Sequence, residues 1–373
     1  MKTKNEHKSL GHPLATGSLL NNVRLLWKNG GMDGRYALRA LNIFLSNLAL
    51  LPFRLVESHQ WAERVKKTQI REPPLFIIGV WRSGTTYLHD LLVKDDRWGY
   101  VSTLQAFCPD ICMEGSAILF PIFRKLLPKK RPNDNVRMAI EYPQEEEYAV
   151  GNLSSFSFYH GYSLPRSMPA LLRTLSFTDD RNGLKEAWKN VYLQVLKKAT
   201  LIMGGKRLVL KNPLSTTRIP ALLEMFPGAK FIFLYRDPYR TYSSLVHWLT
   251  KAVGAYQLEA ISRPEIEEYA FCFYETIMRR YWDTKDLIPQ GNLVEIRYED
   301  LDDNTLAVVE RIYEELGLPG FESARDAFEK YILSQEDYEK NVYTLTPETA
   351  AQISRRWRFA IERLGYPPPS FTP

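Results

Sequence analysis

The sequence predicts an α/β fold in which a parallel sheet is flanked by helices, with a helical appendage at the N-terminus. From Pro74 onward, short β-rich runs alternate with segments of helical spacing, which is the pattern of parallel strands joined by crossover helices. The run LFIIGV at 75–80 is apolar throughout, as expected for a strand buried on both faces. We therefore predict an N-terminal helical segment over 1–70 and a main domain over 71–373.

The same alternation predicts the other elements of the main domain. The strands expected after the first are 207–211, 229–235 and 293–298. The expected helices are 84–93, 215–226, 239–250 and 305–318. Pro238 stands directly before the third of these helices and suits its first turn, because a backbone N–H there would have no helical partner anyway. The elements imply one continuous sheet domain.

The N-terminal region contains the most apolar run of the chain, ALRALNIFLSNLALLPFRLV at 37–56. This run has about the length of a membrane span. Polar or helix-breaking residues interrupt it, namely Arg39, Asn42, Asn47, Pro52 and Arg54. An interrupted apolar helix with basic flanks fits a membrane surface better than a membrane interior. Two alternatives stay open: an interfacial helix in peripheral contact with a membrane, or a core helix packed on the main domain. A spanning helix ranks third.

The composition is that of an ordinary globular protein, with 45% hydrophobic and 25% charged residues. The net charge of +6 suits an anionic ligand or a membrane surface but is too diffuse to indicate nucleic acid. Cys108, Cys112 and Cys272 have neither disulfide nor zinc spacing. Residues 1–30 contain no compact apolar signal segment. We expect free thiols and a cytoplasmic protein, peripheral at the membrane if 37–56 binds there.

The loop after the first strand almost spells a phosphate-binding P-loop. That loop has the pattern G-x-x-x-x-G-K-[ST], and here Gly79 and Gly84 have the right spacing while Thr85 stands in place of the lysine. A P-loop-like fold is therefore expected. Without the lysine, and with no acidic strand end for Mg²⁺, a nucleotide kinase is the weaker alternative.

The same loop is dense in groups that bind anions. Backbone N–H groups at a helix N-terminus cradle negative charge. The hydroxyls of Ser83, Thr85 and Thr86 can donate to anion oxygens, and Arg82 supplies positive charge from within the loop. An ordinary β–α turn that contains glycine and threonine by chance is the less favoured interpretation.

A second segment carries a matching anion motif. The strand expected at 229–235 is followed by Arg236, and Ser244 lies eight residues further along the next helix. Arginine offers a planar fork for phosphate oxygens, and a hydroxyl in the first helical turns points the same way. The two motifs follow carboxyl ends of separate strands, where ligands of parallel sheets bind.

Together, WRSGTT at 81–86 and the segment 210–247 resemble the sulfotransferases that use 3′-phosphoadenosine 5′-phosphosulfate (PAPS). The resemblance is closest to the bacterial branch and to tyrosylprotein sulfotransferases, which share KNP at 211–213 in the form K-D-P, the strand entry MFPGAKF at 225–231 and the arginine at 236. It covers about residues 74–320 and makes 71–373 a sulfotransferase domain.

The resemblance implies PAPS as co-substrate and PAP as product, and it assigns the donor site. The 5′-phosphosulfate is expected on the loop residues and the 3′-phosphate on Arg236 and Ser244. The loop residues concerned are Arg82, Ser83, Gly84, Thr85 and Thr86. Tyr87 follows where an aromatic residue stacks on adenine in cytosolic relatives, and a core-facing tyrosine is the equal alternative.

Sulfuryl transfer is a loose, in-line displacement similar to phosphoryl transfer. Cations near the bridging oxygen stabilise the charge that develops on the leaving phosphate. Arg82 is a candidate for this role, and the resemblance makes Lys211 the catalytic lysine. No metal is required by this mechanism.

The acceptor hydroxyl needs a general base. The position that supplies a glutamate in tyrosylprotein sulfotransferases falls in YVSTLQAF at 100–107, which holds no acid or histidine. Bacterial relatives instead have an acidic cluster after a segment like RPNDN at 131–135. We rank Glu145 and Glu146 ahead of Glu147, with a solvated helix start as the alternative for all three. His160, within an aromatic stretch, is the runner-up because cytosolic relatives use a histidine base.

The acceptor is expected to be a small lipophilic alcohol such as a sterol or lipid. Aromatic residues over 156–162 suggest an apolar pocket, and 37–56 suggests work at a membrane face. A carbohydrate or a protein tyrosine is the alternative acceptor. A nucleotide kinase or a non-catalytic PAP-binding protein is the alternative of another class.

Overall fold

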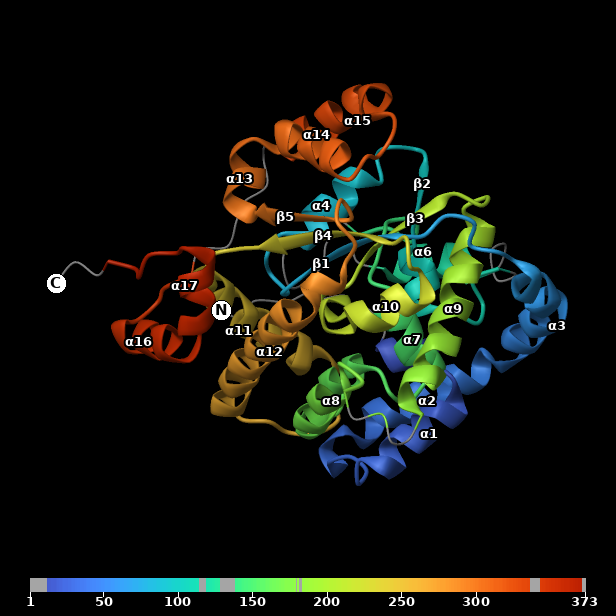
Figure 1. The fold of residues 1–373 in the computed structure, drawn as a ribbon. Coiled ribbons are helices and arrows are strands. Elements are labelled where there is room, and N and C mark those ends of the chain that lie inside the picture. Colours follow the sequence, from blue (N-terminus) through green and yellow to red (C-terminus); the bar gives the residue numbers. More distant parts are fainter. Residues whose placement is uncertain are drawn as a thin grey trace.

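A computed structural model describes residues 12–113, 119–127, 138–178, 180, 183–335 and 343–370. Its centre is a parallel sheet with the strand order β2-β3-β1-β4-β5. The strands are β1 (Leu75–Gly79), β2 (Trp98–Gly99), β3 (Arg207–Lys211), β4 (Lys230–Tyr235) and β5 (Leu293–Arg297). The predicted α/β architecture is confirmed (Figure 1).

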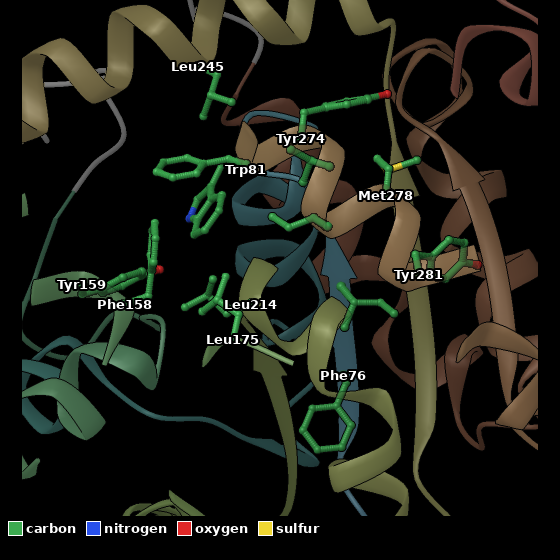
Figure 2. Close-up of a cluster of buried hydrophobic side chains, with 14 of the residues drawn as sticks. Phe76, Trp81, Phe158, Tyr159, Leu175, Leu214, Leu245, Tyr274, Met278 and Tyr281 are labelled. Carbon is green, nitrogen blue, oxygen red and sulfur yellow. The ribbon is translucent and has the colours of Figure 1, made fainter. Parts of the chain in front are cut away.

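Both faces of the sheet are buried. Along β1, Phe76 and Ile78 point into one apolar cluster while Leu75 and Ile77 point into another. This division follows from the strand period of two residues. The prediction of a strand buried on both faces is confirmed, and Figure 2 shows part of the first cluster.

Helices cover each face (Figure 1). The second cluster is closed by α4 (Thr85–Leu92), α13 (Tyr298–Asp303), α14 (Thr305–Glu315) and α15 (Phe321–Leu333). The first is closed by α7 (Glu147–Leu153), α8 (Met168–Thr174), α9 (Leu184–Ile202), α10 (Ile219–Met225), α11 (Pro238–Tyr256), α12 (Arg263–Thr284), α16 (Pro347–Arg356) and α17 (Arg358–Leu364). Each predicted strand and helix of the main domain is present, although 215–226 begins as the 3₁₀ turn η5 (Pro213–Arg218).

A satellite core lies beside the main one. It consists of buried residues around α5 (Thr103–Phe107) and α6 (Leu119–Leu126), and it includes Cys108 and Cys112. All three cysteines are free, as predicted. Burial raises the pKa of the Cys112 thiol to about 12, so this thiol stays protonated and behaves as a small apolar side chain.

The N-terminal region forms α1 (Leu19–Lys28), α2 (Ala37–Ala49) and α3 (Leu51–Lys67). The prediction of one helix over 37–56 is wrong, because the chain bends by 42° between α2 and α3. Pro52 lies in the first turn of α3, where its missing N–H cannot continue the hydrogen bonds of α2. Among the described residues, no single helix is long and apolar enough to cross a membrane. The bent pair of helices 34–49 and 51–67 is long and apolar enough when its two parts are taken together.

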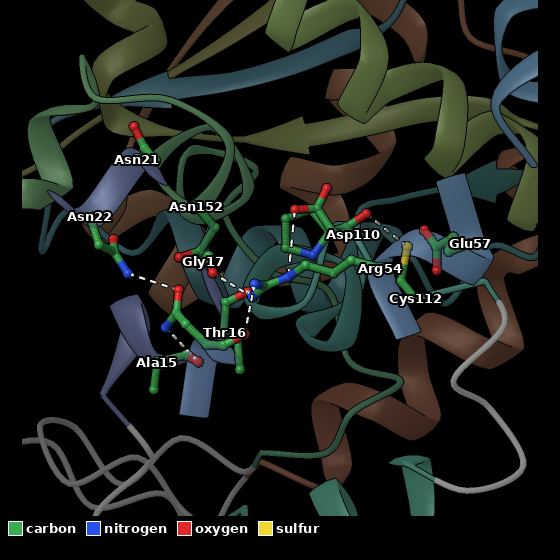
Figure 3. A network of polar contacts seen from close by, with 12 residues as sticks. Ala15, Thr16, Gly17, Asn21, Asn22, Arg54, Glu57, Asp110, Cys112 and Asn152 are labelled. Carbon is green, nitrogen blue, oxygen red and sulfur yellow. Dashed lines mark hydrogen bonds and ion pairs between the residues drawn. The ribbon is translucent and has the colours of Figure 1, made fainter. Parts of the chain in front are cut away.

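Buried polar contacts fix α3 to the body of the protein (Figure 3). Glu57 is buried and accepts from Lys198 Nζ of α9 at 2.5 Å and from the backbone N–H of Met113 at 2.8 Å. Arg54 is buried and donates to the carbonyl oxygens of Thr16, at 2.9 Å, and of Gly17. Two buried polar side chains thus anchor α3 to the rest of the protein.

We expect Lys198→Met to lower the free energy of unfolding by about 3 kcal/mol, because Glu57 then stays buried without its cation. Replacing both partners, as in Glu57→Leu/Lys198→Met, should recover much of the loss. Urea unfolding measures both. Lys285→Met, which breaks the more exposed pair with Glu295, is the control and should cost less than about 1 kcal/mol. Equal losses for the two lysine variants would contradict the account.

Candidate active site

The loop between β1 and α4 lies at the carboxyl edge of the sheet and is held very close to β4. Gly79 has φ 144°, and a Cβ atom there would lie 2.2 Å from the carbonyl oxygen of Leu234. The backbone N–H of Gly79 donates to Thr216 Oγ1 at 2.8 Å, and that hydroxyl donates to the Gly79 carbonyl at 2.9 Å. Only glycine fits at this position. Thr216 belongs to η5, so this 3₁₀ turn holds the loop through two hydrogen bonds.

The loop then brings the two anion motifs together. Arg82 adopts φ 72°, a left-handed conformation uncommon for a residue with a side chain. Its Nε donates to Ser244 Oγ at 2.9 Å, and Arg236 Nη1 donates to the Arg82 carbonyl at 3.2 Å. Three residues predicted from separate motifs thus meet at one place.

A small pocket opens beside this junction. It is lined by Val80, Ser83, Tyr235, Arg236, Thr241, Tyr274 and Met278. Among the described residues, the buried Nε of Arg236 and Oγ1 of Thr241 have no hydrogen-bond partner. Buried donors without partners are costly, so two lining groups are available for an anionic ligand.

Thr241 and Tyr298 were missed by the sequence analysis. Thr241 lies three residues before Ser244 on α11, which places both hydroxyls on one helix face. The three-residue spacing in the sequence could have indicated Thr241 as a further donor beside Ser244. Tyr298 begins α13, and its ring lies 4.2 Å from the guanidinium of Arg236. A Cβ on Gly84 would approach that ring to 2.4 Å, so Gly84 leaves room for the tyrosine.

The remaining loop residues occupy the expected helix start. Gly84 is the N-cap of α4, with φ 91°, and Thr85 is the first helical residue and buried. Ser83 is buried and donates to the Val80 carbonyl at 2.7 Å. Thr86, in the first turn, is half-buried. The predicted glycine turn at a helix N-terminus is present, and anion binding by this loop stays a prediction.

Tyr87 contacts a different part of the protein. Its hydroxyl lies 3.2 Å from Thr305 Oγ1, and its ring stacks on Tyr331 with 6.1 Å between centroids. This is the core-facing alternative of the sequence analysis, in which α4 packs on α14 and α15. A contact with adenine stays a prediction.

A buried ion pair lies at the carboxyl end of β3. Lys211 is the last residue of that strand, pairs in register with Ile77 of β1, and is 1% exposed. Its Nζ donates to one carboxylate oxygen of Glu145, and the hydroxyl of Tyr159 donates to the other. Lys211, the predicted cation, thus contacts Glu145, a predicted base. The Glu145 side chain is 11% exposed, so this ion pair is almost but not fully buried.

The alternative of a solvated helix start is wrong for Glu145–Glu147, since all three are buried. Glu147 binds Arg218 Nη1 at 2.7 Å and accepts from Ser157 Oγ at 2.8 Å, which is a structural pairing. Glu146 accepts from Tyr192 OH at 2.9 Å. Burial raises the pKa of Glu146 to about 7. The segment 131–135 lies outside the described residues.

His160 is buried, and its Nε2 lies 2.8 Å from the carbonyl oxygen of Ser154. Burial lowers the pKa of this imidazole, so the neutral form is favoured. Its neighbour Phe158 packs on Trp81 with 5.7 Å between ring centroids (Figure 2). The aromatic stretch thus forms an apolar wall behind the anion loop.

The parallel sheet with a glycine-rich loop between β1 and α4 defines a P-loop-like α/β protein. Residues 73–323 match the protein family described as "Sulfotransferase family". The chain is also 32% identical over 311 residues to "Omega-hydroxy-beta-dihydromenaquinone-9 sulfotransferase Stf3" of Mycobacterium bovis and of Mycobacterium tuberculosis, which covers 82% of this chain and 78% of each relative. The chain belongs to the sulfotransferase family. The predicted enzyme class is confirmed, and the kinase and non-catalytic alternatives are set aside.

Two solved structures have the same fold. Sulfotransferase STF1 from Mycobacterium tuberculosis superposes with a TM-score of 0.67 at 19% identity and covers 91% of each chain. Sulfotransferase STF9 from Mycobacterium avium gives 0.66 at 19% identity and covers 93% of this chain and 96% of its own. The likeness at this identity concerns the fold alone.

From the raised pKa of Glu146 we predict that the free energy of unfolding depends on pH. The pKa of this glutamate rises from the ordinary 4.5 to about 7 on folding, so the folded state holds this proton more tightly than the unfolded state does. Its contribution to stability is complete below about pH 4.5 and is lost as pH rises through about 7. Glu146→Gln keeps the uncharged form, and we expect it to exceed the wild type by up to about 3 kcal/mol at pH 8 and to match it at pH 4.5.

Urea unfolding at pH 4.5 and pH 8 tests this expectation. Glu141→Gln is the control, because Glu141 is an exposed glutamate paired with Arg124, and it should follow the wild type at both values. A Glu146→Gln protein that loses stability at pH 8 would show that the carboxylate is needed in its ionised form.

Proposed function

We propose that this sulfotransferase uses PAPS and transfers its sulfonate to the hydroxyl of a lipophilic alcohol. The observation that carries the donor assignment is the junction of Arg82, Arg236 and Ser244 beside a pocket with two partnerless donor groups. Cationic forks and hydroxyls fit a nucleotide that carries several anionic groups. The acceptor class is supported by the relative of 32% identity, whose name describes a menaquinone-derived lipid.

In this proposal, Arg236, Ser244 and Thr241 bind the 3′-phosphate side of the donor, while the loop holds its phosphosulfate side. When bound, PAPS supplies a sulfonate on a phosphate leaving group. Arg82 and Lys211 provide positive charge for the oxygen that leaves, which is worth most in a site shielded from water.

Glu145 accepts the proton of the acceptor hydroxyl. Lys211 and Tyr159 both donate to its carboxylate and so hold it in one orientation. Glu146 and His160 remain rivals, but each has a contact directed into the protein, to Tyr192 and to the Ser154 carbonyl. The mechanism derived from these residues uses no metal.

We also propose that residues 37–56 contact a membrane peripherally. The acceptor is lipophilic, and this stretch carries large exposed apolar side chains such as Leu38 and Leu55. Contact with a lipid surface would remove that apolar area from water.

The donor site is tested by calorimetry with PAP and ATP. Arg236→Ala should weaken PAP binding by about 10- to 100-fold, the loss expected for hydrogen bonds to a charged group. Thr241→Val should weaken it by about 5-fold. Arg240→Ala is the matched control on the same helix, because its side chain is 74% exposed, and it should change little. Equal affinity for ATP and PAP, or no loss in Arg236→Ala, would refute the assignment.

The general base is tested in single-turnover reactions with PAPS and a long-chain alcohol. Glu145→Gln should slow transfer by about 100-fold or more, the usual contribution of a general base. Lys211→Met should also slow transfer by about 100-fold, and PAP affinity should stay within about 3-fold in both. His160→Asn should keep most of the rate. A large loss in His160→Asn with an active Glu145→Gln would transfer the role to the histidine.

A further inference from the structure

The helices α2 and α3 present an unusual outer surface, here called the apolar face. It consists of Leu38, Leu41, Phe44, Leu45, Leu48, Leu51, Leu55 and Val56, all exposed. Leu38 is 83% exposed and Leu55 is 62% exposed. On α1, which precedes them, Trp27 is 82% exposed. Contiguous exposed apolar surface of this kind marks a site of interaction.

The opposite side of the same helices is buried and carries polar anchors such as Arg54 and Glu57 (Figure 3). Asn47 has no exposed surface and donates to the carbonyl oxygens of Leu14 and Ala15 at 2.8 and 3.0 Å. Arg54 and Glu57 are anchored in the same way. A helix that packs on a protein in water normally buries its apolar side. In α2 and α3 most of the large apolar side chains are instead exposed, although Ile43 and Val65 are buried. This arrangement indicates that the outer side meets an apolar medium.

The charges around the apolar face favour an anionic lipid surface. Within 19–67, the exposed cationic side chains are Arg24, Lys28, Arg35, Arg64, Lys66 and Lys67. Glu63 is the one exposed acidic residue in that stretch. Basic residues beside an amphipathic helix add attraction to anionic headgroups.

An aromatic track leads from the catalytic pair toward these helices. Tyr159, which donates to Glu145, contacts Tyr148 with 4.5 Å between ring centroids, and Tyr148 contacts Phe107 at 4.8 Å. Tyr148 and Phe107 are half-buried, whereas Tyr159 is buried. Tyr148 and Phe107 thus keep part of their surface exposed within two ring contacts of the candidate base.

The track joins the apolar face through the satellite core. Phe107, Phe53 of α3 and Phe123 of α6 are half-buried and pack against the same cluster, which includes Leu104 and Ile111. Leu51 and Leu55, which flank Phe53 in α3, belong to the apolar face. Phe53 therefore links α3 to the satellite core that Phe107 also contacts, and α3 carries residues of the apolar face on its exposed side.

We propose that this track is the binding site for the tail of the acceptor, a long-chain alcohol taken directly from an anionic bilayer on which the apolar face rests. The tail lies along Phe53, Phe107 and Tyr148, and its hydroxyl reaches Glu145. This inference rests on the proposed function, since it assigns the acceptor side of the same site.

The test compares two acceptors for each variant: a long-chain alcohol in vesicles of phosphatidylcholine and phosphatidylglycerol, and a short water-soluble alcohol. Phe107→Asp should lower kcat/KM for the long-chain alcohol by about 10-fold or more, because a charge on the track opposes contact with a hydrocarbon chain. Its kcat/KM for the short alcohol should stay within about 2-fold of the wild type, which also shows that the variant folds. Leu333→Asp, at a 62% exposed leucine on α15, is the control and should change neither.

Vesicle co-sedimentation tests the apolar face independently of activity. Leu45→Glu/Leu48→Glu should abolish binding to the same vesicles, while Leu287→Glu/Leu333→Glu, at exposed leucines elsewhere, should keep it. A long-chain alcohol with a photoreactive group in its tail should label peptides that contain Phe53, Phe107 or Tyr148.

The outcomes separate the two proposals. If the wild type sulfates both alcohols but Phe107→Asp reduces them equally, or if the tail labels other regions, the track is overturned and the proposed function stands. If both leucine pairs bind vesicles equally, the apolar face is overturned. If the wild type sulfates neither alcohol, the proposed function fails, and the track fails with it.

Discussion

The close approach of Gly79 to the carbonyl of Leu234 is the constraint on which the proposed donor site depends. A side chain at Gly79 would collide with β4, so the loop could not turn where it does. Because it turns there, Arg82 enters the left-handed region and its side chain reaches Ser244 on α11. Strain of this kind persists only where surrounding contacts hold it, and Thr216 supplies such contacts on the far side of the loop.

Three consecutive acids show how packing divides one sequence motif among different roles. Glu147 is neutralised by Arg218 and belongs to the framework, while burial raises the pKa of Glu146 so that its charge is costly near neutral pH. Glu145 faces Lys211 and keeps part of its surface accessible. The proposed base role of Glu145 rests on this combination of a paired carboxylate with some remaining exposure. The difference among the three lies in their partners, since their chemistry is the same.

The sheet and its loops were predictable because the signals are local: apolar runs predict buried strands, and a glycine-rich turn before a helix predicts an anion site. The burial of Glu145 and Glu147 was not, because it depends on Lys211 and Arg218, which lie more than sixty residues away in the chain. The break between α2 and α3 had a visible cause in Pro52, yet proline also occurs in first turns without a bend, and the local pattern does not decide between these outcomes.

The apolar face raises a question that hydrophobic pattern alone cannot answer. Periodicity shows that a helix has an apolar side, but it does not show whether that side faces the protein core or the outside. In α2 and α3 the answer comes from the polar side: Asn47, Arg54 and Glu57 find hydrogen-bond partners inside the protein, and leaving these groups without partners in the interior would be costly. Those contacts orient the helices, and the leucines are turned outward as a consequence. If the aromatic track holds the acceptor as proposed, a surface that docks on lipid would also have a route to Glu145, and membrane contact and acceptor selection would be one physical event.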